Sequence, residues 1–228
     1  MAKTGTSVIV VAAGGSRRMG FDKLLAPLSG SPVLLRTLRA FEDCDAVDEI
    51  IVVAGRGARE AVESWRPELA KLAAMVRAGR GRHPSVAAGL GKLGAEGRWV
   101  RVHDGARPLI QPAQISRCAE VAREHGAAVC ARPMTETIKR VGADGAVSEA
   151  VDREGIWVME TPQVFERGLL ERAYAEVLQL GLLVTDEVSA VQRLGVKIPV
   201  VGNERANPKI TFPGDLALAE CLLRAWEA

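Results

Sequence analysis

Residues 7–20 read SVIVVAAGGSRRMG, a run of β-branched residues that leads directly into a loop of small and basic residues. The apolar part is too short to cross a membrane, and a short apolar run that ends at glycines is typical of a buried strand. Consecutive small residues let the backbone approach a ligand closely, and their amide groups can surround phosphate oxygens. Parallel α/β sheets bind ligands at the carboxyl ends of their strands. The segment therefore predicts a phosphate-binding loop, with a solvated basic turn as the alternative.

Two familiar phosphate-binding loops do not fit this segment. A dinucleotide GxGxxG fingerprint would need glycine at Ser16 and Met19. A Walker A loop would need lysine followed by serine or threonine where Phe21 and Asp22 stand. A nicotinamide-dependent dehydrogenase is therefore not expected.

The rest of the chain alternates short apolar runs with stretches of helical periodicity, which predicts a parallel sheet covered by helices. The expected strands are Ser7–Val11, Glu49–Ala54, Trp99–His103 and Ala127–Ala131, and the expected helices are Val33–Phe41, Ser85–Leu93, Ala113–Glu124, Phe165–Leu180 and Leu216–Trp226. We therefore expect an α/β fold in one domain over residues 1–228. Its core would be a Rossmann-like, three-layer, mostly parallel sheet with helices on both faces.

A segment at about 136–156 departs from this alternation. Thr137–Val141 and Ala146–Val151 are short strand-like runs on either side of a Gly-Ala-Asp-Gly turn at 142–145. This pattern predicts a β-hairpin that protrudes from the main sheet as an arm. Exposed arms of this kind commonly pack on a second subunit, so we expect a homodimer formed through the arm.

The composition limits the classes of function. Thirty basic and 28 acidic residues give a net charge of +2, which does not suggest a nucleic-acid-binding protein. No apolar segment reaches membrane length, so a soluble protein is expected. The four cysteines form no CxxC motif and no zinc-ligand spacing. Reduced, mostly buried cysteines are typical of a cytoplasmic protein.

The loop sequence Ala12-Ala13-Gly14 through Arg17-Arg18-Met19, followed by Lys23, resembles the sugar-nucleotidyltransferase superfamily. It is most similar to the 2-C-methyl-D-erythritol 4-phosphate cytidylyltransferase family. Further segments match that family in order along nearly the whole chain: 79–86, 102–108, 137–140, 151–153, 161–163, 185–189 and 207–220. The departures are mild, with Gly105 in place of the usual alanine and Pro208 before Lys209. None of them removes a charged group that the chemistry needs.

The resemblance implies that CTP reacts with 2-C-methyl-D-erythritol 4-phosphate, releasing pyrophosphate, in non-mevalonate isoprenoid biosynthesis. It implies Arg18, Lys23 and Lys209 as catalytic residues; Ala12, Ala13, Gly14, Gly15, Arg82, Ser85 and Asp104 as CTP-binding residues; and Asp104, Arg107, Thr137, Arg153, Thr161 and Thr185 as substrate-binding residues. Thr137 and Arg153 lie on or beside the arm, so they are expected to act in the partner subunit's site. The alternatives are a ribitol 5-phosphate cytidylyltransferase and a non-catalytic nucleotide-binding protein of the same fold.

Cytidylyl transfer needs cations more than it needs a general base. The attacking phosphate is already ionised at pH 7, while negative charge grows on the α-phosphate and on the leaving pyrophosphate. We therefore expect Mg²⁺ as a cofactor, with Asp104 as its candidate ligand. Taken singly, these residues have simpler explanations: Ser85 as a helix N-cap, Asp104 and Arg107 as a structural ion pair, and His83 as a surface loop residue.

Overall fold

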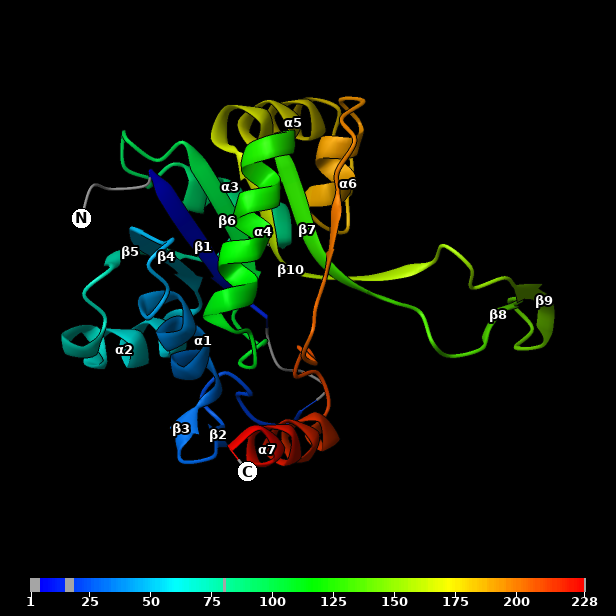
Figure 1. Cartoon of the computed structure of the whole chain (residues 1–228), viewed down its shortest axis with the longest axis horizontal. Coiled ribbons are helices and arrows are strands. Elements are labelled where there is room, and N and C mark those ends of the chain that lie inside the picture. The colour runs from blue at the N-terminus through cyan, green and yellow to red at the C-terminus, as the bar shows by residue number, and fades with distance from the viewer. Residues whose placement is uncertain (1–4, 15–18, 80, 228) are drawn as a thin grey trace.

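The computed structural model describes residues 5–14, 19–79 and 81–227, and its centre is a seven-stranded sheet with helices on both faces (Figure 1). In spatial order the strands are β11 (Val200–Gly202), β7 (Ala127–Pro133), β10 (Trp157–Glu166), β6 (Trp99–Asp104), β1 (Thr6–Ala12), β4 (Glu49–Ala54) and β5 (Leu72–Arg77). Strand β10 runs antiparallel to both neighbours, and the other pairings in this sheet are parallel. The predicted α/β class with a mostly parallel sheet is confirmed.

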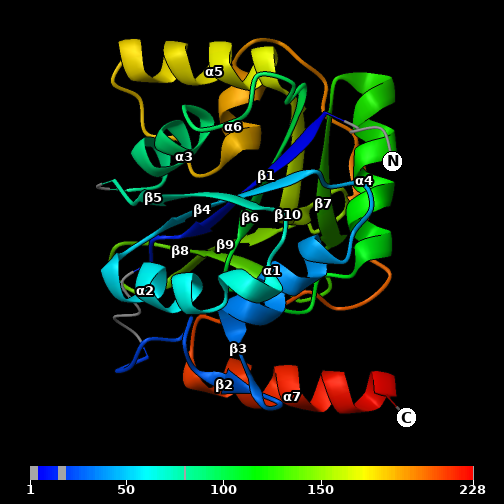
Figure 2. The ribbon, with the colours of Figure 1, turned by 90° about the vertical axis from the view of Figure 1, so that its left-hand side faces the viewer.

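Helices cover the sheet in two sets, which Figure 2 shows on opposite sides of the strands. One core holds α1 (Val33–Glu42), α2 (Arg56–Ser64), α4 (Pro112–His125) and α7 (Pro213–Glu227), and the other holds α3 (Arg82–Leu90), α5 (Arg167–Gln179) and α6 (Glu187–Gln192). Successive side chains of a strand point to opposite faces. Val8 and Val10 of β1 accordingly belong to the first core and Ile9 to the second. Strand β1 is therefore apolar on both faces.

Small elements complete the chain beside these layers. They are the two-stranded pair of β2 (Pro27–Leu28) and β3 (Ser31–Pro32), and a 3₁₀ turn at Arg66–Glu68. Helix α7 packs beside β2, below the main sheet in Figure 1.

Two predicted boundaries need correction. The helix expected to begin at Ser85 begins at Arg82 with Gly81 as its N-cap, so Ser85 lies inside the helix and is not its cap. The helix expected to begin at Phe165 begins at Arg167, because Phe165 still belongs to the preceding strand β10.

The position of the ligand site follows from the strand order. From β1 the chain continues to β4 and β5 on one side, then returns to place β6 on the other side of β1. Ligands bind at such a switch point, beyond the carboxyl ends of the strands. Here Val11 of β1 pairs with Asp104, the last residue of β6.

The expected arm is present as β8 (Ile138–Val141) and β9 (Val147–Val151), an antiparallel pair that extends away from the body in Figure 1. Its apolar side chains are not covered within the chain. Val141 is 56% exposed and Val147 is 66% exposed. Trp157, where the chain returns to the sheet, is also exposed.

Within the described ranges, no helix combines the length and the apolar composition needed to cross a membrane. Cys44, Cys118 and Cys130 are buried, Cys221 is exposed, and all four are free thiols. The predicted burial of most cysteines is therefore confirmed.

Candidate active site

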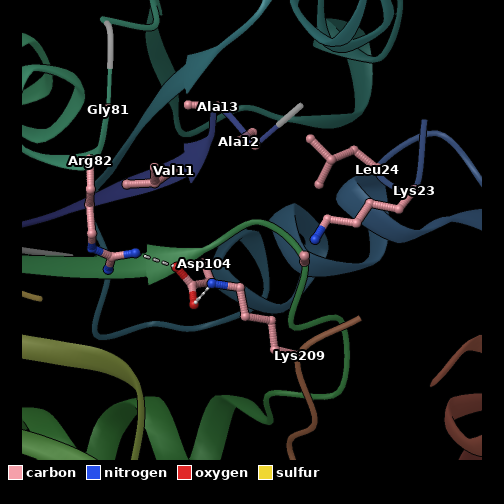
Figure 3. A pocket seen from close by; sticks show the side chains of 11 residues that line it. Val11, Ala12, Ala13, Lys23, Leu24, Gly81, Arg82, Asp104 and Lys209 are labelled. Atoms are coloured by element: carbon pink, nitrogen blue, oxygen red, sulfur yellow. Dashed lines mark hydrogen bonds and ion pairs between the residues drawn. The ribbon is translucent and has the colours of Figure 1, made fainter. Parts of the chain in front are cut away.

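A cavity of about 230 Å³ lies at the carboxyl ends of β1 and β6. Its lining contains many of the predicted site residues: Ala12, Ala13, Gly14, Lys23, Arg82, Asp104 and Lys209. Figure 3 shows Arg82 and Lys209 meeting at the Asp104 carboxylate while Lys23 points into the cavity from the far side. The predicted residues Gly15 and Arg18 lie outside the described residues.

Asp104 is the centre of the charged cluster. Its Oδ1 accepts a hydrogen bond of 2.7 Å from Arg82 Nη1, and its Oδ2 lies 2.9 Å from Lys209 Nζ and 3.5 Å from Arg107 Nε. Burial opposes ionisation of this carboxyl, but the charges of Arg82, Lys209 and Arg107 outweigh it. They hold the pKa of Asp104 far below its usual range, so the carboxylate stays ionised. The surplus of cations around it suits a phosphate-bearing ligand.

Lys23 and Lys209 come from opposite ends of the chain. Lys23 is buried, and its Nζ donates a 2.7 Å hydrogen bond to the carbonyl of Ile210, the residue after Lys209. The Ile210 amide in turn donates to the carbonyl of Ala106, just beyond β6. These bonds hold the three segments that carry Lys23, Asp104 and Lys209 against one another.

Arg107 and Thr161 lie beneath the cavity and are not part of its lining. Arg107 Nη1 donates a 2.7 Å bond to the carbonyl of Asn207, two residues before Lys209. The Thr161 hydroxyl accepts a 3.1 Å bond from the amide of Asp104 and lies 3.0 Å from His103 Nδ1. Both were predicted to bind substrate, but their polar groups are used to position neighbouring site residues.

Ser85 has a similar supporting position under the loop at 79–81. It is fully buried, and its hydroxyl donates to the Gly81 carbonyl at 2.7 Å and accepts from the Gly79 amide at 3.1 Å. Gly81 lines the cavity with φ of +108°, a conformation that side chains disfavour. Ser85 therefore shapes the predicted CTP-binding loop from below.

Three predicted substrate-binding residues are not brought to the cavity within this chain. Thr137 and Arg153 are exposed at the arm, where Arg153 Nη1 donates to the Thr135 carbonyl. The arm extends away from the body in Figure 1. Thr185 is exposed just before α6, with its hydroxyl 3.2 Å from Ser189 Oγ.

Two residues of the site differ from the sequence prediction. His83 was expected on the surface, which is wrong, because it is buried in the first turn of α3 with Nε2 against the Val184 carbonyl. Glu187 was given no role, yet it is fully buried and bonded to Arg82. The sequence signal for Glu187 was weak: it is one acidic residue at the start of a short apolar helix, 105 positions from Arg82.

This combination of features defines an α/β nucleotidyltransferase. A small-residue loop and fixed lysines surround a cavity at the switch point of the sheet, where they can hold a triphosphate and stabilise charge that develops during its cleavage. The sequence model of the 2-C-methyl-D-erythritol 4-phosphate cytidylyltransferase family matches residues 6–225. The chain belongs to this family.

Individual relatives agree along almost their whole length. The chain is 42% identical to the 2-C-methyl-D-erythritol 4-phosphate cytidylyltransferase of Symbiobacterium thermophilum, covering 95% of this chain and 92% of that protein. It is 39% identical to that of Dehalococcoides mccartyi, covering 95% of each. The crystal structure of the Thermus thermophilus enzyme of the same name superposes with a TM-score of 0.80 at 34% identity, covering 96% of this chain and 98% of that one.

Proposed function

We infer that the protein transfers the cytidylyl group of CTP to 2-C-methyl-D-erythritol 4-phosphate in non-mevalonate isoprenoid biosynthesis. The products are 4-diphosphocytidyl-2-C-methyl-D-erythritol and pyrophosphate. The observation that carries this conclusion is the family match over residues 6–225, joined to a cavity in which Lys23, Asp104 and Lys209 converge. The ribitol 5-phosphate alternative is not favoured, since the relatives matched along their whole length carry the methylerythritol name.

The cations of the cavity fit the reaction. An oxygen of the acceptor phosphate forms a bond to the α-phosphorus of CTP, while the bond from that phosphorus to the bridging oxygen of the β-phosphate breaks. Lys23 and Lys209, on opposite sides of the cavity, are placed to neutralise the charge that grows on the phosphates. Arg18, outside the described residues, is proposed to assist them.

The remaining cavity surface suits recognition of the two substrates. The backbone of 12–14 and Gly81 offers amides and carbonyls to the nucleotide in a space without bulky side chains. Asp104 is proposed to accept hydrogen bonds from hydroxyl groups of the acceptor, together with Thr185. Thr137 and Arg153 are proposed to contact the acceptor phosphate across the dimer interface.

We propose Mg²⁺ as the cofactor, held by phosphate oxygens of CTP. Mg²⁺ commonly binds through one or two carboxylates together with substrate phosphates. Both oxygens of Asp104 are already paired with cations, so Asp104 does not fit as a metal ligand in this arrangement. The described part of the chain contains no group of three or more His, Cys, Asp or Glu side chains that could hold a metal ion.

The arm supports a homodimer, because its apolar side chains lack cover within the chain. A cytoplasmic location is also proposed. Free thiols, most of them buried, suit a reducing compartment.

The direct test is pyrophosphate release from CTP and Mg²⁺, with 2-C-methyl-D-erythritol 4-phosphate and ribitol 5-phosphate in parallel. Release that strongly favours the methylerythritol phosphate is expected. Release that favours ribitol phosphate would leave the mechanism in place and overturn the acceptor. Binding of CTP without release with either acceptor would overturn the catalytic function.

A further inference from the structure

A chain of buried polar groups leads from the second helical layer to the cavity. Tyr174 of α5 donates a 2.8 Å hydrogen bond to Glu187 Oε1. Glu187, at the start of α6, accepts from Arg82 Nε at 3.0 Å and from Arg82 Nη2 at 2.8 Å. Arg82 Nη1 then donates to Asp104 at 2.7 Å. Four separate elements, α5, α6, α3 and β6, therefore meet at one guanidinium group.

The guanidinium of Arg82 is almost fully committed to carboxylates. Three of its nitrogens donate to Glu187 or Asp104, and Glu187 accepts through both oxygens. A planar guanidinium held by two bonds to one carboxylate has a fixed orientation as well as a fixed charge. Burial works against the charged form, but Glu187 and Asp104 raise the pKa of Arg82 above its usual value. Arg82 is thus held in place and kept charged beside Asp104.

We propose that Glu187 is a positioning residue for the acceptor, acting through Arg82 and supported by Tyr174. It fixes Arg82 so that the guanidinium holds Asp104 Oδ1, instead of turning toward the phosphates of CTP in the same cavity. Asp104 then presents its carboxylate to the acceptor in one orientation. This inference rests on the proposed role of Asp104 toward the hydroxyl groups of the acceptor.

The same contacts connect the second acceptor segment to the nucleotide loop. His83, beside Arg82 in α3, contacts the carbonyl of Val184, and Glu187 lies two residues beyond Thr185. The first turn of α3 therefore holds the 184–187 segment at two points. Loss of the Glu187 charge would loosen both Asp104 and the segment that carries Thr185, so the acceptor should be affected more than CTP.

The first test is Glu187→Gln, measured with both substrates varied. We expect KM for 2-C-methyl-D-erythritol 4-phosphate to rise roughly tenfold, the scale of one lost charge-assisted hydrogen bond. KM for CTP should change by less than about twofold, because the loop at 12–14 remains in place. Tyr174→Phe removes one hydrogen bond and should change acceptor KM in the same direction by a smaller factor. Glu176→Gln in α5, whose partner is the surface residue Arg193, is the matched control and should match the wild type.

A double-mutant cycle with Arg82→Met separates positioning from general damage. If Glu187 acts through Arg82, adding Glu187→Gln to Arg82→Met should raise acceptor KM no further. Equal increases in KM for both substrates, or a full second increase in the double variant, would overturn the proposal. Tyr174→Phe keeps the test valid if Glu187→Gln does not fold. Wild-type protein assayed in parallel tests the function itself, while the ratio of variant to wild type tests Glu187.

Discussion

At the scale of single residues, His103 shows how a titratable group beside the site can be excluded from the chemistry. It is fully buried next to Asp104 in the sequence, and burial lowers the pKa of His103 to about 3, although the charge of Asp104 opposes this shift. Its Nε2 faces the Arg107 carbonyl at 3.3 Å, so that nitrogen carries the proton. Nδ1 then accepts from the Thr161 hydroxyl, which itself accepts from the Asp104 amide. The neutral imidazole braces Asp104 and does not act as a base.

This burial predicts a pH dependence of stability. The folded pKa lies below the unfolded value of 6.5, so the stabilisation is complete above pH 6.5 and is lost as the pH falls toward 3. The loss is at most about 1.4 kcal/mol per pH unit. Urea unfolding at pH 7 and pH 5 should show a smaller decrease in the free energy of unfolding for His103→Gln than for wild type. Equal decreases would contradict the shift, and His125→Gln at the exposed end of α4 is the control.

Lys23 is the described residue whose charge we expect to matter most for the rate. Lys23→Ala should lower kcat/KM by on the order of 10²–10³, because a fixed cation that faces developing charge is removed. The lost bond to the Ile210 carbonyl should cost about 1 kcal/mol of stability. Pyrophosphate release and thermal melting separate the two effects. Lys197→Ala, at an exposed position, is the control, and a Lys23 variant with near wild-type activity would refute the role.

At the scale of elements, the sequence predicted those whose patterns are local. The strands at 49–54 and 99–104 have continuous apolar runs, and the structure confirms them. Strand β5, with the sequence LAAMVR, was not predicted, because Leu, Ala and Met favour helix and only pairing with β4 makes it a strand. Strand β10 was missed because polar Glu160, Thr161 and Gln163 interrupt it, and these are buried only through tertiary contacts.

The candidate site was predictable to a similar degree. Lys23, Asp104 and Lys209 stand in motifs that the family resemblance identified, and all three line the cavity. The bonds between Arg82 and Glu187 join two helices far apart in sequence. No local pattern specifies which buried charges will meet, so this part of the site required the fold.

The loop before α3 gives a prediction about one element. Gly81→Ala should destabilise the protein by roughly 1–2 kcal/mol and raise KM for CTP, because its φ of +108° strains any side chain beside the cavity. Gly91→Ala is the matched control at the other end of the same helix. Its φ is −66° and a Cβ there meets only ordinary contacts, so stability should be unchanged or slightly raised. Chemical unfolding and CTP titration measure both, and equal effects at the two glycines would count against the loop strain.

At the scale of the whole molecule, the distribution of the site residues makes a single chain appear incomplete. Lys23 and Lys209 lie in the body, whereas Thr137 and Arg153 lie at the arm. The arm leaves the sheet between β7 and β10 and presents Val141 and Val147 to solvent. Burying those valines against a second copy would remove apolar surface from water and could carry Arg153 to the partner's cavity.

Shared sites of this kind predict recovery of activity when two inactive variants are mixed. Lys23→Ala and Arg153→Ala proteins should each be nearly inactive. After subunit exchange, half of the dimers are mixed, and each mixed dimer has one site with both mutations and one site with neither. About a quarter of the wild-type activity should therefore return. Mixing Lys23→Ala with Lys209→Ala is the matched control, because both residues come from one body and every site in a mixed dimer keeps one defect. With light scattering confirming dimers and exchange, recovery in the first mixture alone would establish that the arm completes the neighbouring site, and no recovery in either would place Arg153 outside it.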